Sequence, residues 1–145
     1  MPPTPEQELG QLLAGVSRLH RTMADRSLDA IGLFRGQSML LMVLSRHDGV
    51  THSEAAEKLG ISAAAVSKVV KRMERGGYVE RRADPTDERL SRVYLREPGQ
   101  ALIARIDAAF AKLDSEMLAG FDGADRERLR DLLQRMRTNL SQFQP

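Results

Sequence analysis

The sequence of 145 residues contains no cysteine and no tryptophan, and aromatic residues make up only 4% of it. The lack of cysteine excludes disulfides, thiolate metal sites and thiol-based redox sensing, and it fits a reducing compartment. The scarcity of aromatic residues means that the core must consist mainly of Leu, Val, Ile, Ala and Met side chains.

Long hydrophobic runs are also missing. The longest of them, such as MLLMVL at residues 39–44, are far shorter than the about 20 apolar residues that cross a membrane. The first residues, MPPTPEQE, carry acidic groups where a secretory signal peptide carries basic ones. We therefore expect a cytoplasmic protein without a membrane partner.

Charged residues are plentiful, at 29% of the sequence, but the net charge is only +2. Their distribution is uneven. Residues 61–96 contain nine Lys and Arg against five Asp and Glu, a net charge of +4, whereas the rest of the chain has a net charge of −2. A basic middle within an acidic frame indicates a surface that attracts a polyanion. A solvated charged face is the alternative interpretation.

The length and the 41% hydrophobic content suit one globular domain, residues 1–145. Apolar residues spaced three and four apart predict helices at about 5–27 and 35–47. The periodicity then breaks, and Val50 with Thr51 are expected to form a short strand. Ser53 is expected to cap a third helix, which ends at Leu59.

The second half of the chain continues with helix and strand signals. Ser62 is expected to cap a fourth helix that runs to about Arg75, where two glycines terminate it. The alternating runs 78–82 and 89–95, separated by ADPTDE, predict a β-hairpin with a long polar tip. Two further helices are expected at about 98–118 and 124–142.

The third and fourth helices, joined by a tight turn at Gly60, form a predicted helix-turn-helix. A helix-turn-helix alone is weak evidence, since any helical bundle can contain one. A β-hairpin directly after it predicts a winged helix, whose second helix enters the major groove of DNA. The inner face of the motif is expected to bury Leu59, Ile61, Val66 and Val69.

Three alanines open this recognition helix. Small side chains let the backbone approach base edges, and their methyl groups can contact thymine methyls. The alternative is that the alanines simply favour helix and that the nearby cations keep it soluble. The residues predicted to bind DNA are Ser62, Ala63, Ala64, Ala65, Ser67, Lys68, Lys71 and Arg72, with Asp87, Arg89 and Arg92 on the hairpin.

Asp87 is included for its effect on a neighbour. A carboxylate repels phosphate, so we expect Asp87 to hold Arg89 or a nearby arginine in place through an ion pair. A guanidinium fits a narrow minor groove, where the potential is most negative. The alternative is an exposed ion pair of little energetic value.

Over essentially its whole length the chain resembles the MarR family of bacterial and archaeal transcription regulators. The supporting stretches are GLFRGQSMLLMVL (32–44), GVTHSEAAEKLGISAAAVSKVVKRMERGGYVERR (49–82) and DPTDERLSRVYLREPGQAL (84–102). The last is the most specific, because the family's wing shows Asp-x-Arg, here Asp87-Glu88-Arg89, then an apolar strand and a Gly, here Gly99.

Two positions depart from the family pattern. Ala65 stands where the family often has a hydroxyl residue, which predicts poorer hydrogen-bond readout of bases. Arg96 stands where the family has Thr after the last wing strand, so a helix cap is lost and a charge that attracts phosphate is gained.

The resemblance implies a mainly α-helical fold, in which a winged helix-turn-helix with a small β-hairpin wing (33–96) is flanked by dimerisation helices (5–32 and 97–143). It implies a homodimer that represses transcription by binding a pseudo-palindromic operator in double-stranded DNA, with wing arginines in the minor grooves. It also implies a cleft for a small aromatic or anionic effector. The residues expected to line that cleft are His20, Arg21, Met23, Met39, Met42 and Arg46.

Other functions are less well supported by the sequence. His47 and His52 flank a turn beside Asp48, but no tight ligand spacing predicts a metal site, and no cofactor is expected. The sequence contains no P-loop, dinucleotide-binding turn, nucleophile elbow or metalloprotease helix, so we do not expect an enzyme. A helical protein-interaction module that does not bind DNA is the alternative function, and an ordinary packed histidine is the alternative interpretation of His20.

Overall fold

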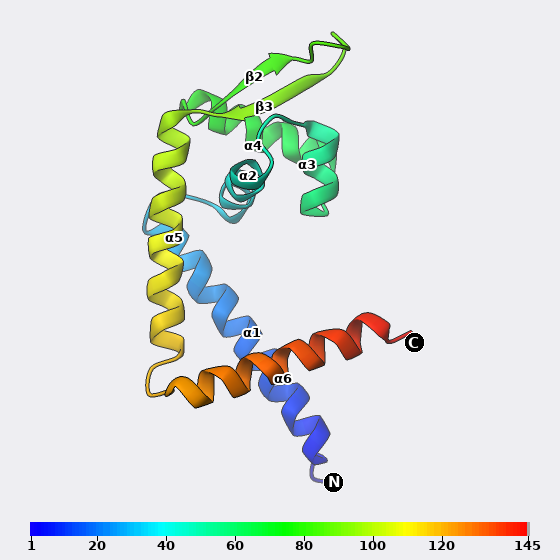
Figure 1. Cartoon of the computed structure of the whole chain (residues 1–145), viewed down its shortest axis with the longest axis vertical. Helices are drawn as coiled ribbons and strands as arrows, with labels where there is room; N and C mark the ends of the chain where they lie inside the picture. The colour runs from blue at the N-terminus through cyan, green and yellow to red at the C-terminus, as the bar shows by residue number, and fades with distance from the viewer. Residues whose placement is uncertain (145) are drawn as a thin grey trace. The chain divides into compact units, whose positions relative to one another are not determined.

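The computed structural model describes residues 1–144, which form helices and one small antiparallel sheet (Figure 1). The elements are α1 (Pro5–Asp29), α2 (Arg35–Arg46), β1 (Val50–Thr51), α3 (His52–Leu59), α4 (Ala63–Arg75), β2 (Val79–Ala83), β3 (Ser91–Leu95), α5 (Glu97–Met117) and α6 (Gly123–Gln142). The predicted mainly helical fold with a winged helix-turn-helix is confirmed. The chain forms two compact units, Met1–Ala111 and residue 112 onward.

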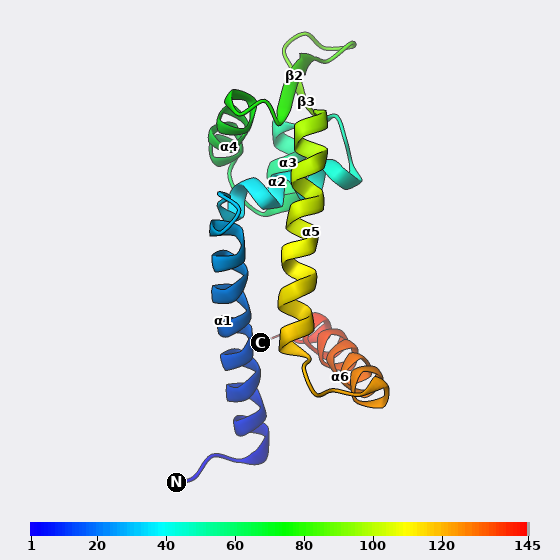
Figure 2. The ribbon, with the colours of Figure 1, turned by 90° about the vertical axis from the view of Figure 1, so that its left-hand side faces the viewer.

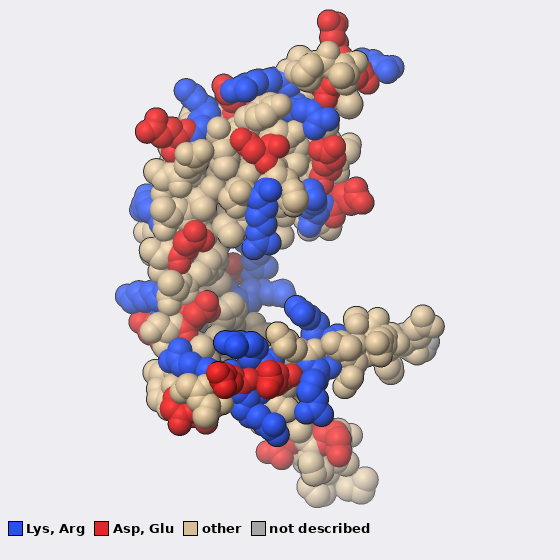
Figure 3. Space-filling model, viewed as in Figure 1, with Lys and Arg blue, Asp and Glu red and all other residues tan. Residues whose placement is uncertain are grey.

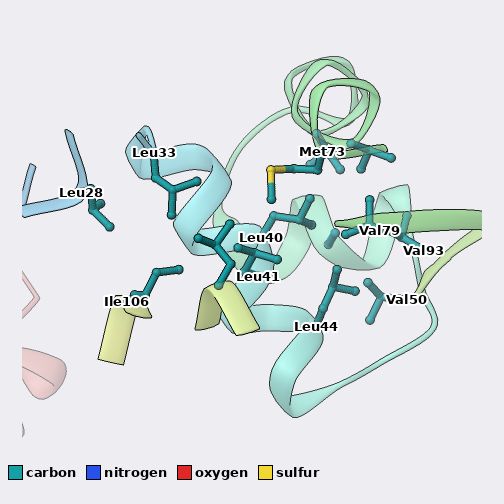
Figure 4. Packing of buried hydrophobic residues seen from close by; sticks show 14 residues of the cluster. Leu28, Leu33, Leu40, Leu41, Leu44, Val50, Met73, Val79, Val93 and Ile106 are labelled. Atoms are coloured by element: carbon teal, nitrogen blue, oxygen red, sulfur yellow. The ribbon is translucent and has the colours of Figure 1, made fainter. Parts of the chain in front are cut away.

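The core of the first unit is built around α2. Leu40, Leu41 and Leu44 of this helix are completely or almost completely buried. They meet apolar side chains from α4, α5 and the sheet, as Figure 4 shows. Burying a side chain of this size stabilises the fold by about 1.5–3 kcal/mol. The helix-turn-helix and the hairpin therefore share one core, which fixes α4 relative to the hairpin.

The sheet ties the hairpin to the connection between α2 and α3. Its strand order is β1-β3-β2, and Val93 of the central strand pairs with Val50 on one side and Arg81 on the other. The carboxylate of Asp48 accepts hydrogen bonds from the backbone N–H groups of Gly49 at 3.1 Å and Leu95 at 2.9 Å. In Figures 1 and 2 the hairpin projects from the end of this unit where α4 lies, and α1 leaves at the other end.

The prediction that Ser53 caps α3 is wrong. Thr51 is the cap: its Oγ1 accepts from the backbone N–H of Glu54 at 3.1 Å, and Glu54 Oε2 accepts from the N–H of Thr51 at 2.9 Å. This reciprocal pair is a capping box. The helix begins two residues earlier than expected because β1 ends at the residue that caps α3.

Two other local predictions need correction. Arg89 and Leu90 lie in the hairpin tip rather than in the second strand, which begins at Ser91. Ile61 is 38% exposed instead of buried, while Val70, which was not predicted for the inner face, is fully buried. Ile61 precedes the first turn of α4 and so lies outside the face that packs against α2.

Two glycines occupy positions where a side chain would be strained or would clash. Gly60 ends α3 with φ +65° and ψ 31°, the left-handed conformation that lets α4 turn back across α3. Gly99 of α5 packs against the chain just before β2: a Cβ at this position would lie 2.3 Å from the backbone oxygen of Tyr78. The start of α5 therefore lies directly against the base of the hairpin.

The second unit contains α6, which Asp122 caps by accepting from the N–H of Asp125 at 2.8 Å. The apolar residues of this helix are largely exposed, as are those of α1 in the first unit. The exposed apolar side chains are Leu9, Leu12, Val16, Leu19 and Met23 on α1, and Leu132, Leu133, Met136 and Leu140 on α6. No helix within residues 1–144 is both long and apolar enough to span a membrane.

Candidate nucleic-acid interface

The start of α4 presents small side chains to solvent. Ser62 caps the helix, its Oγ accepting from the N–H of Ala65 at 3.1 Å, as predicted. Ala63 and Ala64 are exposed and Ala65 is half-buried. Because no long side chain covers the first turn, the backbone of α4 is open to close approach by a large partner.

Basic side chains follow on the same helix. Lys68, Lys71 and Arg72 are all exposed. Neither lysine forms an ion pair with a described residue. The Arg72 guanidinium lies 5.3 Å from the ring centre of Phe34, a cation–π contact that holds it beside the start of α2. The exposed α4 residues among those predicted to bind DNA thus lie in one accessible region.

Ser67 differs from these residues because it is half-buried and already has a partner. Its Oγ lies 3.0 Å from Nδ1 of His52, the first residue of α3. Burial and the positive charge of Arg81 lower the pKa of His52 below its ordinary value, and the carboxylate of Glu74 opposes this shift. The imidazole is therefore neutral near pH 7. Sequence reasoning did not connect His52 with the recognition helix.

The tip of the hairpin is organised by Asp84, which is only 5% exposed. Its Oδ1 accepts from the backbone N–H of Thr86 at 2.8 Å, the hydroxyl of Thr86 at 2.7 Å and the N–H of Asp87 at 3.1 Å. Its Oδ2 accepts from Nε of Arg92. The Thr86 hydrogen bonds, with that of Arg92, hold the pKa of Asp84 well below its ordinary range.

Asp87 and Arg89 pair at the tip, as the sequence predicts. The Asp87 carboxylate accepts from the backbone N–H of Arg89 and from its Nε, both at 3.1 Å. The Arg89 side chain is nevertheless 90% exposed. Figure 3 shows basic and acidic side chains next to each other at the end of the hairpin. The pair thus orients an arginine without burying it.

Arg92 lies at the base of the tip rather than at its end. It pairs with Asp84, donates from Nη1 to the backbone oxygen of Gly49 at 2.8 Å and lies 3.5 Å from Glu54. The structure therefore places Arg92 among contacts that join the hairpin to β1 and α3. Of the two arginines predicted to bind DNA on the hairpin, Arg89 alone extends into solvent.

Asp84, like His52, was missed by sequence reasoning. A local signal for it was present, since Asp followed by Pro and Thr is typical of a turn in which the Asp side chain accepts from the next backbone N–H groups. The longer-range contacts of Asp84 with Arg92 and of His52 with Ser67 had no sequence signal.

A cavity of about 940 Å³ lies in the first unit between α1, α2, α3 and the residues before α4. Five of the six residues predicted for an effector cleft line it: His20, Arg21, Met39, Met42 and Arg46. Met23 is not among the lining residues, and its side chain is 39% exposed. The apolar side chains of Leu59, Ile61 and Phe110 also line the cavity.

An ion pair between Asp25 of α1 and Arg35 of α2 also lines this cavity. The two side chains are held by two hydrogen bonds, from Nε and Nη2 of Arg35, which lower the pKa of Asp25. The cavity thus combines an apolar floor with cationic groups, a chemistry that suits a small molecule with an apolar body and an anionic group.

The histidines beside the α2–α3 turn do not assemble a metal site in this structure. Asp48 is engaged by two backbone N–H groups and His52 faces Ser67. Within residues 1–144, His, Asp and Glu side chains nowhere form a group of three that could hold a metal ion.

Comparisons with known proteins agree with one another. A family model described as MarR family matches residues 31–90. The uncharacterized HTH-type transcriptional regulator YwoH of Bacillus subtilis is 30% identical over 111 residues, 77% of this chain and 80% of YwoH. Another such regulator of that organism, YdgJ, is 28% identical over 137 residues, 94% of this chain and 84% of YdgJ.

Solved structures share the fold. Wild-type MarR of E. coli in its apo form superposes with a TM-score of 0.80 at 21% identity, covering 94% of this chain and 98% of MarR. A mutant of MepR from S. aureus bound to an oligodeoxyribonucleotide superposes with a TM-score of 0.68 at 22% identity, covering 91% and 97% of the two chains.

Proposed function

The chain belongs to the MarR family of transcription regulators and has a helix-turn-helix DNA-binding fold, and from this premise we propose that it represses transcription as a homodimer on a pseudo-palindromic DNA operator. The observation that supports this proposal most directly is the exposed surface of α4, where small side chains are followed by basic ones, beside an exposed arginine on the hairpin tip. Both elements pack on one core.

In this proposal α4 enters the major groove. The alanine turn lets the helix backbone approach base edges, and Lys68 and Lys71 reach phosphates on either side. Arg89 enters the adjacent minor groove, where its guanidinium meets the most negative potential of the duplex. Asp87 orients that arginine, and Arg92 acts indirectly by bracing the base of the tip. A MepR mutant of the same fold is bound to an oligodeoxyribonucleotide, which supports the proposal that this chain binds DNA.

The exposed apolar faces support the homodimer. Side chains on α1 and α6 such as Leu12, Leu19 and Leu140 are more than half exposed in the single chain, although water contact with them is unfavourable. A two-fold dimer would cover them and present two copies of α4, so half-sites should lie about 10 bp apart, one turn of DNA.

An effector would act through the cavity between α1 and α2. We propose that a small aromatic or anionic molecule binds there, with Arg21 or Arg46 facing its charge and Met39 and Met42 its apolar part. A ligand can weaken DNA binding only by as much as it prefers the dimer conformation that does not bind DNA. We therefore expect the effector to lower the affinity for DNA about 5- to 150-fold. The proposed compartment is the cytoplasm, where DNA is accessible.

The test is selection of binding sites from random DNA, followed by titration of the selected operator at several salt concentrations. Arg89→Ala should weaken binding at least about fivefold per half-site and flatten the salt dependence by about one counterion per half-site. Arg105→Ala removes an exposed cation from α5 and serves as the control, with little expected change.

An unchanged salt slope in Arg89→Ala would contradict the proposed role of the hairpin. Failure to select any DNA sequence would contradict the function itself and favour a helical protein-interaction module. A complex of that kind, formed through apolar contacts, should depend only weakly on salt, whereas DNA binding should weaken steeply as salt rises.

A further inference from the structure

The contact between His52 and Ser67 joins the two helices of the helix-turn-helix. Nδ1 of His52 lies 3.0 Å from Ser67 Oγ. On the other side of the ring, Nε2 is buried and has no hydrogen-bond partner within residues 1–144. The imidazole therefore forms one hydrogen bond with the described residues, and its partner lies on the helix proposed to enter the major groove.

The buried Nε2 decides which nitrogen of the neutral ring carries the proton. A proton on Nε2 would leave a buried N–H without an acceptor, whereas a proton on Nδ1 leaves only a buried lone pair. In folded proteins, orphaned buried N–H groups are rarer than under-satisfied buried acceptors. The geometry therefore favours the Nδ1–H tautomer, in which His52 donates and Ser67 accepts.

We propose that His52 is a positioning residue for DNA recognition: its Nδ1–H holds Ser67 Oγ as an acceptor and leaves the Ser67 hydroxyl proton to an acceptor on a base edge. This inference rests on the DNA binding proposed above. Ser67 lies one turn after Ala63 and Ala64 and one turn before Lys71, so it shares their side of α4.

The direction of this hydrogen bond determines what Ser67 reads. A serine committed to donating favours guanine O6, purine N7 or thymine O4, and it disfavours the amino groups of adenine and cytosine. With the opposite tautomer, Ser67 would donate to His52 and present lone pairs, which favour those amino groups. His52 thus sets the base preference at one operator position without touching DNA.

The first test examines the free protein, independently of DNA binding. Nitrogen-15 NMR of the uniformly labelled full chain distinguishes the two tautomers through the chemical shifts of the imidazole nitrogens. We expect the proton of His52 on Nδ1 at pH 7.5, and the signal is assigned by its loss in His52→Phe. A proton on Nε2 would overturn the proposal.

The second test is a double-mutant cycle on the selected operator. His52→Phe keeps a ring of similar size without a donor, and it should weaken binding about three- to tenfold per half-site. Ser67→Ala should do the same, and the double variant should bind no more weakly than Ser67→Ala alone. Lys71→Ala is the matched control. When His52→Phe is combined with it, the fold losses in operator affinity of the two single variants should multiply.

The base preference at each operator position, measured by selection from random DNA, distinguishes a positioning role from a purely structural one. A purely structural role would weaken binding without changing the preferred base. Ser67→Ala and His52→Phe should relax the same operator position, whereas His52→Asn, whose amide can donate from the place of Nδ1, should keep it. Losses that multiply between His52→Phe and Ser67→Ala, or relaxation at different positions, would refute the inference. If His52→Phe does not fold, the selections with His52→Asn and Ser67→Ala test the inference on their own. Absence of all DNA binding in the unmodified protein would instead refute the proposed function.

Discussion

At the scale of residues, the hairpin tip depends on a carboxylate that lies beneath it. Asp84 accepts three hydrogen bonds from the tip and pairs with Arg92, which in turn contacts the backbone of Gly49. Arg89 forms no hydrogen bond or ion pair with Asp84 or Arg92, yet its position follows from theirs because Asp87, its partner, donates its own backbone N–H to Asp84.

Asp84→Asn tests this dependence. The amide keeps the shape and one acceptor for Thr86 and Asp87 but loses the charge that faces Arg92, so the tip should open more often. We expect backbone amides of residues 85–90 to exchange hydrogen about tenfold faster, measured by hydrogen–deuterium exchange. Glu88→Gln makes the same change of charge at an exposed tip residue and should leave exchange unchanged. Equal exchange in Asp84→Asn and the unmodified protein would contradict this role.

Local residue contacts were the part of the site that the sequence could predict. The pairing of Asp87 with Arg89 involves residues two apart, and the cap of Ser62 on α4 residues three apart. The partners Asp84 and Arg92 lie eight residues apart, and His52 and Ser67 fifteen. Such contacts depend on how the sheet and helices pack, which periodicity and turn propensity do not determine.

At the scale of elements, α5 begins against the strand that opens the hairpin. The backbone N–H of Arg96 donates to the oxygen of Tyr78 at 3.0 Å, and Gly99 passes close enough to that oxygen to leave no room for a side chain. The resemblance to the family pointed to this glycine, but only the packed structure gives the reason for it.

Gly99→Ala should therefore destabilise the fold even though alanine is the better helix former. The added methyl would overlap a backbone atom rather than a flexible side chain, which costs about 1–3 kcal/mol. We expect a lower Tm by calorimetry and weaker DNA binding. Gly123→Ala, at the open start of α6, makes the same change where nothing lies within 4 Å and should leave Tm unchanged or slightly higher. An unchanged Tm in Gly99→Ala would count against the close packing.

Element types were predicted better than their ends. Helical periodicity located all the long helices, because apolar side chains recur every three to four residues whether their stripe is buried, as in α2, or exposed, as in α1 and α6. The start of α3 was misplaced because β1 and α3 share Thr51 as their junction, so no linker separates strand from helix. The hairpin strands were shifted because the hydrogen bonds of Asp84 keep Arg89 and Leu90 within the tip.

At the scale of the whole molecule, the proposed binding to a two-fold operator depends on the proposed homodimer. The apolar side chains of α1 that are exposed in one chain lie on one side of the helix, with Leu12 near the middle of the stripe and Ala14 on the opposite side. If this stripe is the dimer contact, a charge within it must be desolvated when the dimer forms.

Leu12→Glu should accordingly give monomers at micromolar concentration in sedimentation velocity and lower the operator affinity at least about a hundredfold, since a monomer binds one half-site at a time. Ala14→Glu introduces the same carboxylate on the other side of α1 and should leave the dimer intact. A dimeric Leu12→Glu, or an unmodified protein that is monomeric, would remove the basis for a two-fold operator.

Strand β1, which adds a third strand to the hairpin, affects the entropy cost of binding. An isolated two-stranded hairpin is marginal in water, but β3 also pairs with β1, and Asp48 and Arg92 add contacts across that junction. Ordering a flexible backbone costs about 1–2 kcal/mol per residue in conformational entropy. Because the hairpin is already folded in the free chain, this entropy is lost during folding of the protein rather than during association. In the proposed complex, little of it would therefore offset the free energy gained when Arg89 displaces counterions from the duplex.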